Sequence, residues 1–208
     1  MPAHHQCLLF LAILILIVNP SPAQSTREYR LVPAESSFRV FVGKAGLFSA
    51  LAHDHNIGIR SYTGRILLSP KGVADSRLEM SVDTRSLVVL DQNVSERDRA
   101  KITRSMHEEV LESARYPEAL FRSTGISGLK DEGNGEYSLQ LQGDLTLHGQ
   151  TRSITIPLTL RSTPGQIRAT GRYTLKQTDF GIRPYSTAGG TIKVRNEVVI
   201  EFQITARG

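Results

Sequence analysis

Two histidines separated by a single residue, His53 and His55, have the type and spacing that could do chemistry. Residues at positions i and i+2 project from the same side of an extended chain, so both imidazoles could bind one metal ion. A catalytic metal site needs about three protein ligands. Asp54, His107 and Glu108 are candidates for the third, and the spacing selects none of them. The histidine pair is therefore compatible with a metal site but does not specify one.

A catalytic role is the second interpretation, with His53 as general base and Ser49 or Asp54 as its partner. The sequence contains no G-x-S-x-G turn and no paired carboxylates to support it. Such a site needs a base, a nucleophile and an orienting group together. We expect His107 on the exposed surface of a helix and His148 in a solvent-facing turn, so neither supplies the missing group.

The surroundings of the histidine pair favour a third interpretation, the rim of an apolar cavity. The run LFSALAHDHNIGI is apolar on both sides of the histidines. Leu47, Phe48 and Leu51 would line the entrance of the cavity, and His53 and His55 would meet the polar head of a bound ligand. We therefore expect a binding protein without catalysis.

The N-terminal segment predicts export. An unbroken apolar run covers residues 7–18, which is the length of a signal-peptide core and too short to span a bilayer. Small residues at Ser21 and Ala23 suit a cleavage point. We expect residues 1–23 to be a signal peptide and residues 24–208 to form one domain of a periplasmic or secreted protein.

Composition excludes several classes of protein. A chain of 208 residues that is 39% hydrophobic can form one domain with a sizeable core. Its only cysteine, Cys7, lies in the leader, so no disulfide would hold the mature domain. The net charge of +5 is spread over the chain without a dense basic run, which argues against nucleic acid and allows weak attraction to anionic lipid headgroups.

Most of the chain after the leader predicts an antiparallel sheet. Short segments alternate apolar and polar residues and are separated by turn signals such as 131–136 and 162–165. About eight strands with one apolar face each need a closed or sandwiched sheet. The clearest alternating segments are 36–42, 62–68, 76–83, 137–147, 153–160 and 196–206, and the fourth and fifth should form a hairpin.

One segment breaks this period and predicts a helix that stops before Pro117. Ser95 and Asp98 have the spacing of a capping box, and apolar residues follow at intervals of four. The charges oppose the helix dipole, because basic residues come early and acidic residues late. We expect ion pairs such as Arg104 with Glu108 to offset this cost.

The interior of such a barrel is either filled by side chains or wide enough for one small ligand. The inward-facing residues are mostly aliphatic, and the chain has no Trp. These features favour an elongated apolar cavity.

Several motifs together resemble one known family. They include YRLVPAESSFRVFV, YTGRILLSP, VDTRSL, YPEALFRST, LTLHGQTRSITIPL and TDFGI, and they cover nearly the whole mature chain. On these motifs the sequence resembles the YceI-like, polyisoprenoid-binding family of exported bacterial proteins. The run ALAHDHNI departs from the turn that many members have at this place.

The resemblance implies an all-β fold, an eight-stranded antiparallel lipocalin-like barrel with one α-helix in a long connection. It also implies that the barrel holds an isoprenoid lipid of polyprenyl or quinone type, without any other cofactor. Transient membrane contact and a homodimer stay open. By position, the expected ligand contacts are Phe38, Val40, Val42, Tyr62, Ile66, Leu68, Met80, Val82, Ile102, Met106 and Phe121, together with Leu47, Phe48, Leu51, His53 and His55 at the rim.

Overall fold

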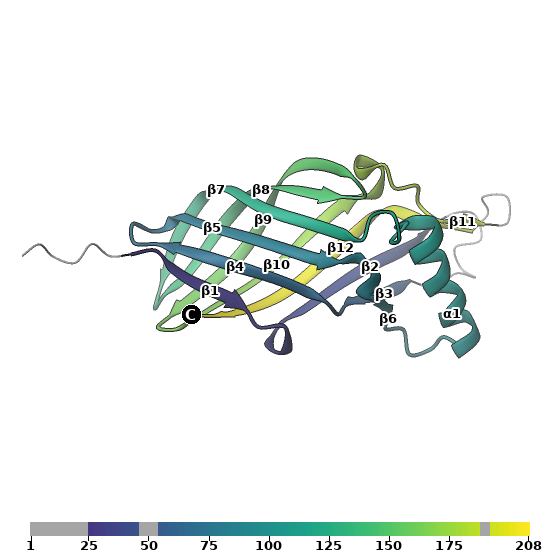
Figure 1. Cartoon of the computed structure of the whole chain (residues 1–208), viewed down its shortest axis with the longest axis horizontal. Coiled ribbons are helices and arrows are strands. Elements are labelled where there is room, and N and C mark those ends of the chain that lie inside the picture. The colour runs from purple at the N-terminus through teal and green to yellow at the C-terminus, as the bar shows by residue number, and fades with distance from the viewer. Residues whose placement is uncertain (1–24, 46–53, 188–191) are drawn as a thin grey trace, which may run out of the picture.

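Eight antiparallel strands form a closed ring in the computed structural model, which describes residues 25–45, 54–187 and 192–208 (Figure 1). Each strand pairs with the next, and the pairing of the first with the last closes the barrel. This confirms the predicted fold class. In ring order the strands are β1 (Arg27–Leu31), β4 (Tyr62–Ser69), β5 (Gly72–Asp83), β7 (Glu118–Gly133), β8 (Glu136–Leu147), β9 (Gln150–Thr163), β10 (Gln166–Lys176) and β12 (Ile192–Arg207).

Three further strands continue the sheet from β12 toward one end of the barrel. A 3-10 turn η1 (Pro33–Glu35) separates β1 from β2, and a 3-10 turn η3 (Thr84–Ser86) separates β5 from β6. The chain also bends between β3 and β4. Pro33 suits such a break because proline lacks the N–H that a strand ladder needs. The extensions are β2 (Ser37–Ala45), β3 (His55–Ile59) and β6 (Leu87–Val89), and β12, β2, β3 and β6 pair in that order.

Tight turns join the long strands of the other half. Asn134 and Gly135 connect β7 to β8, and His148 and Gly149 connect β8 to β9, all four with positive φ. Two-residue turns of this kind match the twist of a hairpin. The predicted hairpin of segments 137–147 and 153–160 is confirmed as β8 paired with β9. A short 3-10 turn η5 (Gln177–Phe180) and the strand β11 (Ser186–Thr187) lie between β10 and β12.

The helix forms where the sequence predicts it, but it is shorter. It begins with the Ser95 hydroxyl accepting a hydrogen bond from the Asp98 backbone at 3.1 Å, runs through α1 (Glu96–Ser105) and continues as one π-helical turn η4 (Met106–Val110). Glu112 has a φ of +44°, which cannot continue a helix. No helix within the described residues is long and apolar enough to cross a membrane.

The helix covers the side of β6 that has no strand partner. Residues Ser86 and Leu90 bond to the β3 side, so the carbonyls of Leu87 and Val89 point the other way. Arg99 donates to the Val89 carbonyl at 2.7 Å and also to that of Asp91. His107 Nε2 lies 3.1 Å from the Leu87 carbonyl oxygen. Side chains of the helix therefore take the place of a neighbouring strand.

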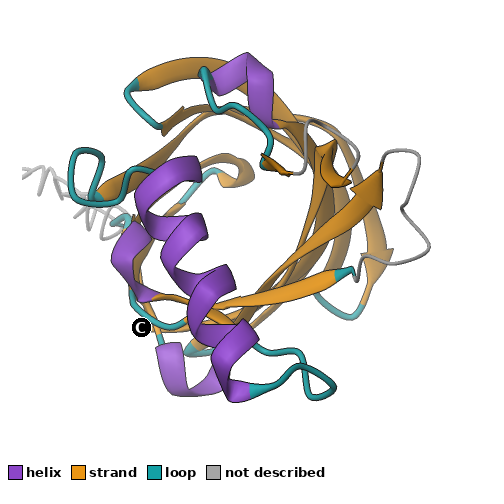
Figure 2. Cartoon of the chain, turned by 90° about the vertical axis from the view of Figure 1, so that its right-hand side faces the viewer, coloured by secondary structure: helices purple, strands orange, loops and turns teal. Residues whose placement is uncertain are grey.

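Viewed toward this end, the helix lies across part of the barrel opening (Figure 2). The inward face of η4 contributes Met106 and Val110 to the wall of the interior, next to Leu87. Strand residues form the rest of the wall. The helix is therefore a structural part of the barrel rather than a surface appendage.

Candidate functional site: the barrel interior

An apolar cavity of about 300 Å³ occupies the interior of the barrel. Alternate residues of the ring strands point inward and supply a wall that is largely apolar, with mostly aliphatic and some aromatic side chains. A cavity of this size is at the lower end of the range for small-ligand sites. Its composition suits an apolar molecule.

Three polar side chains of the wall are already bonded to the protein. Ser76 Oγ donates to the Gly72 carbonyl at 3.0 Å and accepts from the Ser69 backbone at 3.1 Å. Thr84 Oγ1 donates to the Tyr116 carbonyl at 2.7 Å. Gln177 Nε2 donates to the Arg195 carbonyl at 2.8 Å. These groups are satisfied without a ligand, so they offer no obvious nucleophile or base.

Tyr173 is the ionisable inward-facing side chain of the wall. Burial, together with the negative charge of Asp179, raises the pKa of its phenol. A raised phenol pKa keeps the group neutral at neutral pH. Arg77 also borders the cavity, but it is exposed and its guanidinium donates to the Ser76 carbonyl at 3.0 Å. The cavity thus presents an uncharged surface to its contents.

The structure brings many of the predicted contact residues together around the cavity. Tyr62, Ile102 and His55 do not border it. Leu47, Phe48, Leu51 and His53 lie outside the described residues. Those that do line the cavity are Phe38, Val40, Val42, Ile66, Leu68, Met80, Val82, Met106 and Phe121.

Tyr62 belongs to the packed core beside the cavity. It is 5% exposed, and its ring meets Phe38 edge-on with centroids 4.8 Å apart. Its hydroxyl donates to the Pro33 carbonyl at 3.3 Å, and burial raises the pKa of the phenol. Its hydroxyl is therefore used to hold the turn η1 against the barrel.

The expected contacts came mainly from the first half of the chain and omitted much of the wall. Strands β8, β9, β10 and β12 contribute residues such as Leu139, Leu141, Ile156 and Ile200. The same alternation that predicts these strands also gives their inward faces. The signal was present in the sequence, and it identifies the wall equally well in both halves.

Two phenylalanines lie against glycines of the neighbouring strand. A Cβ atom at Gly143 would stand 2.4 Å from Phe121 Cζ, and one at Gly171 would stand 2.4 Å from Phe202 Cζ. Gly143 on β8 pairs with Ser123, two residues after Phe121 on β7, and Gly171 on β10 pairs directly with Phe202 on β12. The glycines let the rings lie along the wall, which keeps space in the interior.

His55 has an ion-pair partner that the sequence did not reveal. Its Nδ1 lies 2.7 Å from Asp91 Oδ2, and the other oxygen of Asp91 accepts from the Asn56 backbone at 2.8 Å. The side chains of His55 and Asp91 are 19% and 12% exposed. Because a carboxylate only accepts, Nδ1 carries the proton of this bond. The described residues contain no cluster of three or more His, Cys, Asp or Glu that could hold a metal ion.

The expectations for the other two histidines were wrong. His107 is half-buried rather than on the exposed helix surface, and its Nδ1 lies 3.0 Å from the hydroxyl of Ser113. His148 faces the protein rather than solvent, with a side chain 10% exposed. Its Nε2 lies 3.1 Å from Glu112 Oε1, and its ring contacts that of Tyr116 in a tilted arrangement, with centroids 4.2 Å apart. The Leu87 carbonyl is 20 residues from His107, and Glu112 is 36 residues from His148. Local sequence could not show these contacts.

These features define a class, a lipocalin-like β-barrel that encloses an apolar cavity and is partly covered by a helix. The family model of the YceI-like domain matches residues 29–206, which is nearly all of the barrel. The chain belongs to the YceI-like family.

Curated relatives and solved structures agree with this assignment. A UPF0312 protein of Vibrio parahaemolyticus is 42% identical over 96 residues, covering 46% of this chain and 44% of that protein. One of Shewanella denitrificans is 34% identical over 109 residues, covering 52% of this chain and 51% of that protein. The match therefore spans about half the length of these relatives.

Two solved structures share the fold at low sequence identity. BcnA of Burkholderia cenocepacia has a TM-score of 0.64 at 18% identity, covering 84% of this chain and 98% of its own. A polyisoprenoid binding domain from Saccharophagus degradans, implicated in plant cell wall breakdown, has a TM-score of 0.62 at 15% identity, covering 86% and 98%. At these identities the likeness concerns the fold.

Proposed function

We propose that this protein is an exported, non-catalytic carrier that holds an isoprenoid or another long apolar lipid inside its barrel. The observation that carries the proposal is the cavity inside the barrel, whose wall is apolar apart from a few polar side chains, of which Ser76, Thr84 and Gln177 are already bonded to the protein. Family membership and the polyisoprenoid binding domain among the structural neighbours support it. The apolar N-terminal run supports export.

The energetics of such binding need no reactive group. Each buried methylene contributes about 0.8 kcal/mol, so a chain of several isoprene units gains enough from burial alone to bind tightly. A polyprenyl chain and a quinone tail share this chemistry. The proposal covers both, and a transient contact with the membrane that contains the lipid is part of it.

The test is native mass spectrometry of the protein expressed with its own N-terminal segment in a bacterial host, followed by organic extraction and metal analysis of the same sample. We expect a polyprenyl or quinone mass at about one per chain and no stoichiometric metal. A tightly held zinc or iron in a protein without lipid would contradict the carrier and favour a site at His53 and His55.

A pair of neighbouring substitutions locates the lipid in the cavity. Ile156→Trp adds bulk to the inner face of β9, whereas Thr155→Trp adds the same bulk to the exposed outer face. We expect the first variant to lose most of the extractable lipid and the second to keep it. Circular dichroism shows whether both variants fold. Equal lipid content in two folded variants would place the lipid elsewhere.

A further inference from the structure

One exposed face of α1 carries a stripe of basic residues. Arg97, Lys101 and Arg104 are spaced by four and three residues, which places them on the same side of the helix. All three are exposed. Within the part of the chain that the structure describes, none of them makes a hydrogen bond or ion pair. We call these three residues the basic stripe.

Among the described residues, the acidic side chains of the helix form no ion pair with the basic stripe, although they carry negative charge close to it. Asp98 accepts from the Ser95 hydroxyl at 2.7 Å, and Glu109 accepts from that of Ser105 at 2.8 Å. Glu112, just beyond η4, pairs with His148 and Arg115. Glu96 and Glu108 are exposed at the two ends of the stripe.

The ion pair expected between Arg104 and Glu108 is not formed in the described structure. Such pairs were expected to offset the cost of basic residues early in the helix. Arg97 lies in the first turn, where the helix dipole disfavours a cation. With no ion-pair partner among the described residues, the three cations of the stripe are available to a negatively charged partner outside the chain.

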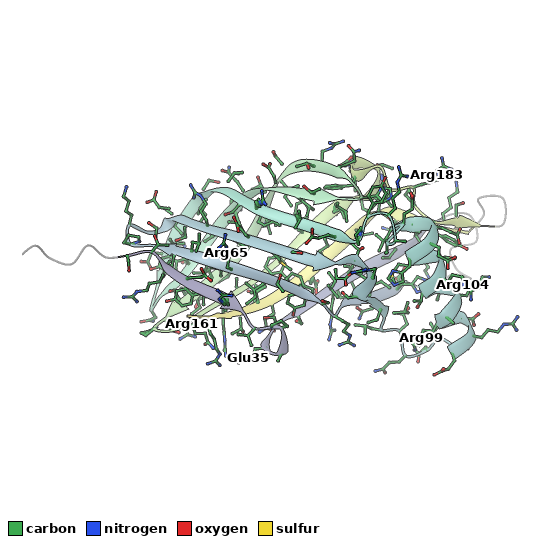
Figure 3. The ribbon with its side chains drawn as sticks, viewed as in Figure 1. Glu35, Arg65, Arg99, Arg104, Arg161 and Arg183 are labelled. Atoms are coloured by element: carbon green, nitrogen blue, oxygen red, sulfur yellow. The ribbon has the colours of Figure 1, made fainter. Side chains whose placement is uncertain are left out.

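The position of the basic stripe indicates which partner this is. Figure 3 shows Arg99 and Arg104 on the helix at one end of the barrel and Arg183 at the same end, whereas Arg161 and Glu35 lie toward the other end. Arg183 is also exposed. The helix leads directly into η4, where Met106 and Val110 line the cavity. The stripe therefore lies on the outer side of the same segment that contacts the cavity on its inner side.

We propose that the basic stripe docks the barrel on an anionic bilayer, with the phosphate groups of the lipid headgroups as its counterions. Cations spaced along one side of a helix can each interact with the negatively charged surface of such a bilayer. Each cation contributes about 1 kcal/mol near this surface, which corresponds to a factor of about five in binding. The inference extends the proposed function, because it names the surface through which the carrier meets its source of lipid.

The experiment is vesicle flotation with the protein as the bacterial host delivers it, its intact mass recorded. The probes are vesicles of phosphatidylcholine alone and vesicles with about one third phosphatidylglycerol. The test variant is R97Q/K101Q/R104Q. The matched control is R122Q/R161Q/R168Q, which removes the same charge from exposed arginines of the barrel wall. Free inorganic phosphate is added separately as a competitor.

We expect the unmodified protein and the control to float with the anionic vesicles and to be released by raising the salt concentration. The test variant should bind about a hundredfold more weakly, because it lacks three cations that each contribute a factor of about five. Equal binding of both variants, or binding that ignores salt and vesicle charge, would overturn the inference. Release by millimolar phosphate at constant ionic strength would also overturn it, because it would indicate a discrete phosphate site.

Lipid content is measured on the same preparations by organic extraction. Loss of vesicle binding with lipid still present in the barrel would support the basic stripe as a docking surface separate from the cavity. An empty barrel that docks normally would contradict the proposed carrier function and leave the docking surface standing. The two proposals can thus fail independently.

Discussion

Each histidine in the described structure is defined by a partner far along the chain. His55 meets Asp91, His107 meets Ser113 and the Leu87 carbonyl, and His148 meets Glu112. His107 is the clearest case, because a carbonyl oxygen only accepts. Its Nε2 must therefore carry the proton, and its Nδ1 accepts from the hydroxyl of Ser113.

Replacing His107 should destabilise the protein through these two bonds. In His107→Ala the hydroxyl of the buried Ser113 loses the imidazole and keeps only the Thr84 carbonyl, at 3.5 Å, as an acceptor, and the Leu87 carbonyl loses its donor. We expect the free energy of unfolding in urea to fall by about 1 to 3 kcal/mol. Glu108→Ala, at the exposed neighbouring position, should change it by less than about 0.5 kcal/mol. Similar losses in both variants would show that the two bonds contribute little.

At the scale of elements, the sequence correctly predicted the features that depend on residues close together in the chain. Alternation gave the strands and placed Ile66 and Met80 on the inner face, and the Ser95 cap gave the start of the helix. The end of the helix and the breaks in the strands were missed. They depend on contacts across the barrel, such as the bond from His107 to β6, which no local pattern records.

The same limit applies to the candidate site. The cavity wall follows from residue alternation, but its shape depends on how Phe121 and Phe202 lie over Gly143 and Gly171 on the adjacent strands. Pairing and register decide this, and neither is visible in one sequence. The partner of His55 was missed for the same reason, because Asp91 lies 36 residues away.

The close contact between Phe121 on β7 and Gly143 on β8 can be tested by substituting the glycine. In Gly143→Ala the new methyl group would clash with the ring and with the Arg122 carbonyl, at 2.6 Å, so the ring must move toward the cavity. We expect a loss of about 1 to 3 kcal/mol in the free energy of unfolding and a lower lipid content after extraction.

Gly125→Ala is the matched control for this substitution. A Cβ atom at Gly125 on the adjacent strand would meet only the flexible end of Gln142, at 3.0 Å. Its lipid content should equal that of the unmodified protein. If Gly143→Ala also kept its full lipid content, the position of the Phe121 ring would not control the volume of the cavity.

At the scale of the whole molecule, a bound lipid should contribute to stability. A ligand that binds only the folded state stabilises it by about 2.7 kcal/mol at one hundred times its dissociation constant. For a domain of this size we expect extraction of the lipid to lower the melting temperature by about 5 to 10 °C. Scanning calorimetry before and after extraction measures the change. An unchanged melting temperature after verified removal would argue against a lipid held inside the barrel.

The way the helix covers β6 also bears on how copies of this protein behave at high concentration. An uncovered strand offers free backbone groups to which another chain can add, and this is a common start of aggregation and domain swapping. The pairing of β1 with β12 closes the ring. The additional strands β2, β3 and β6 pair in that order beyond β12, and β6 is the last of them. Arg99 and His107 occupy its outward carbonyls. Two helix side chains thereby protect the barrel from strand-mediated self-assembly.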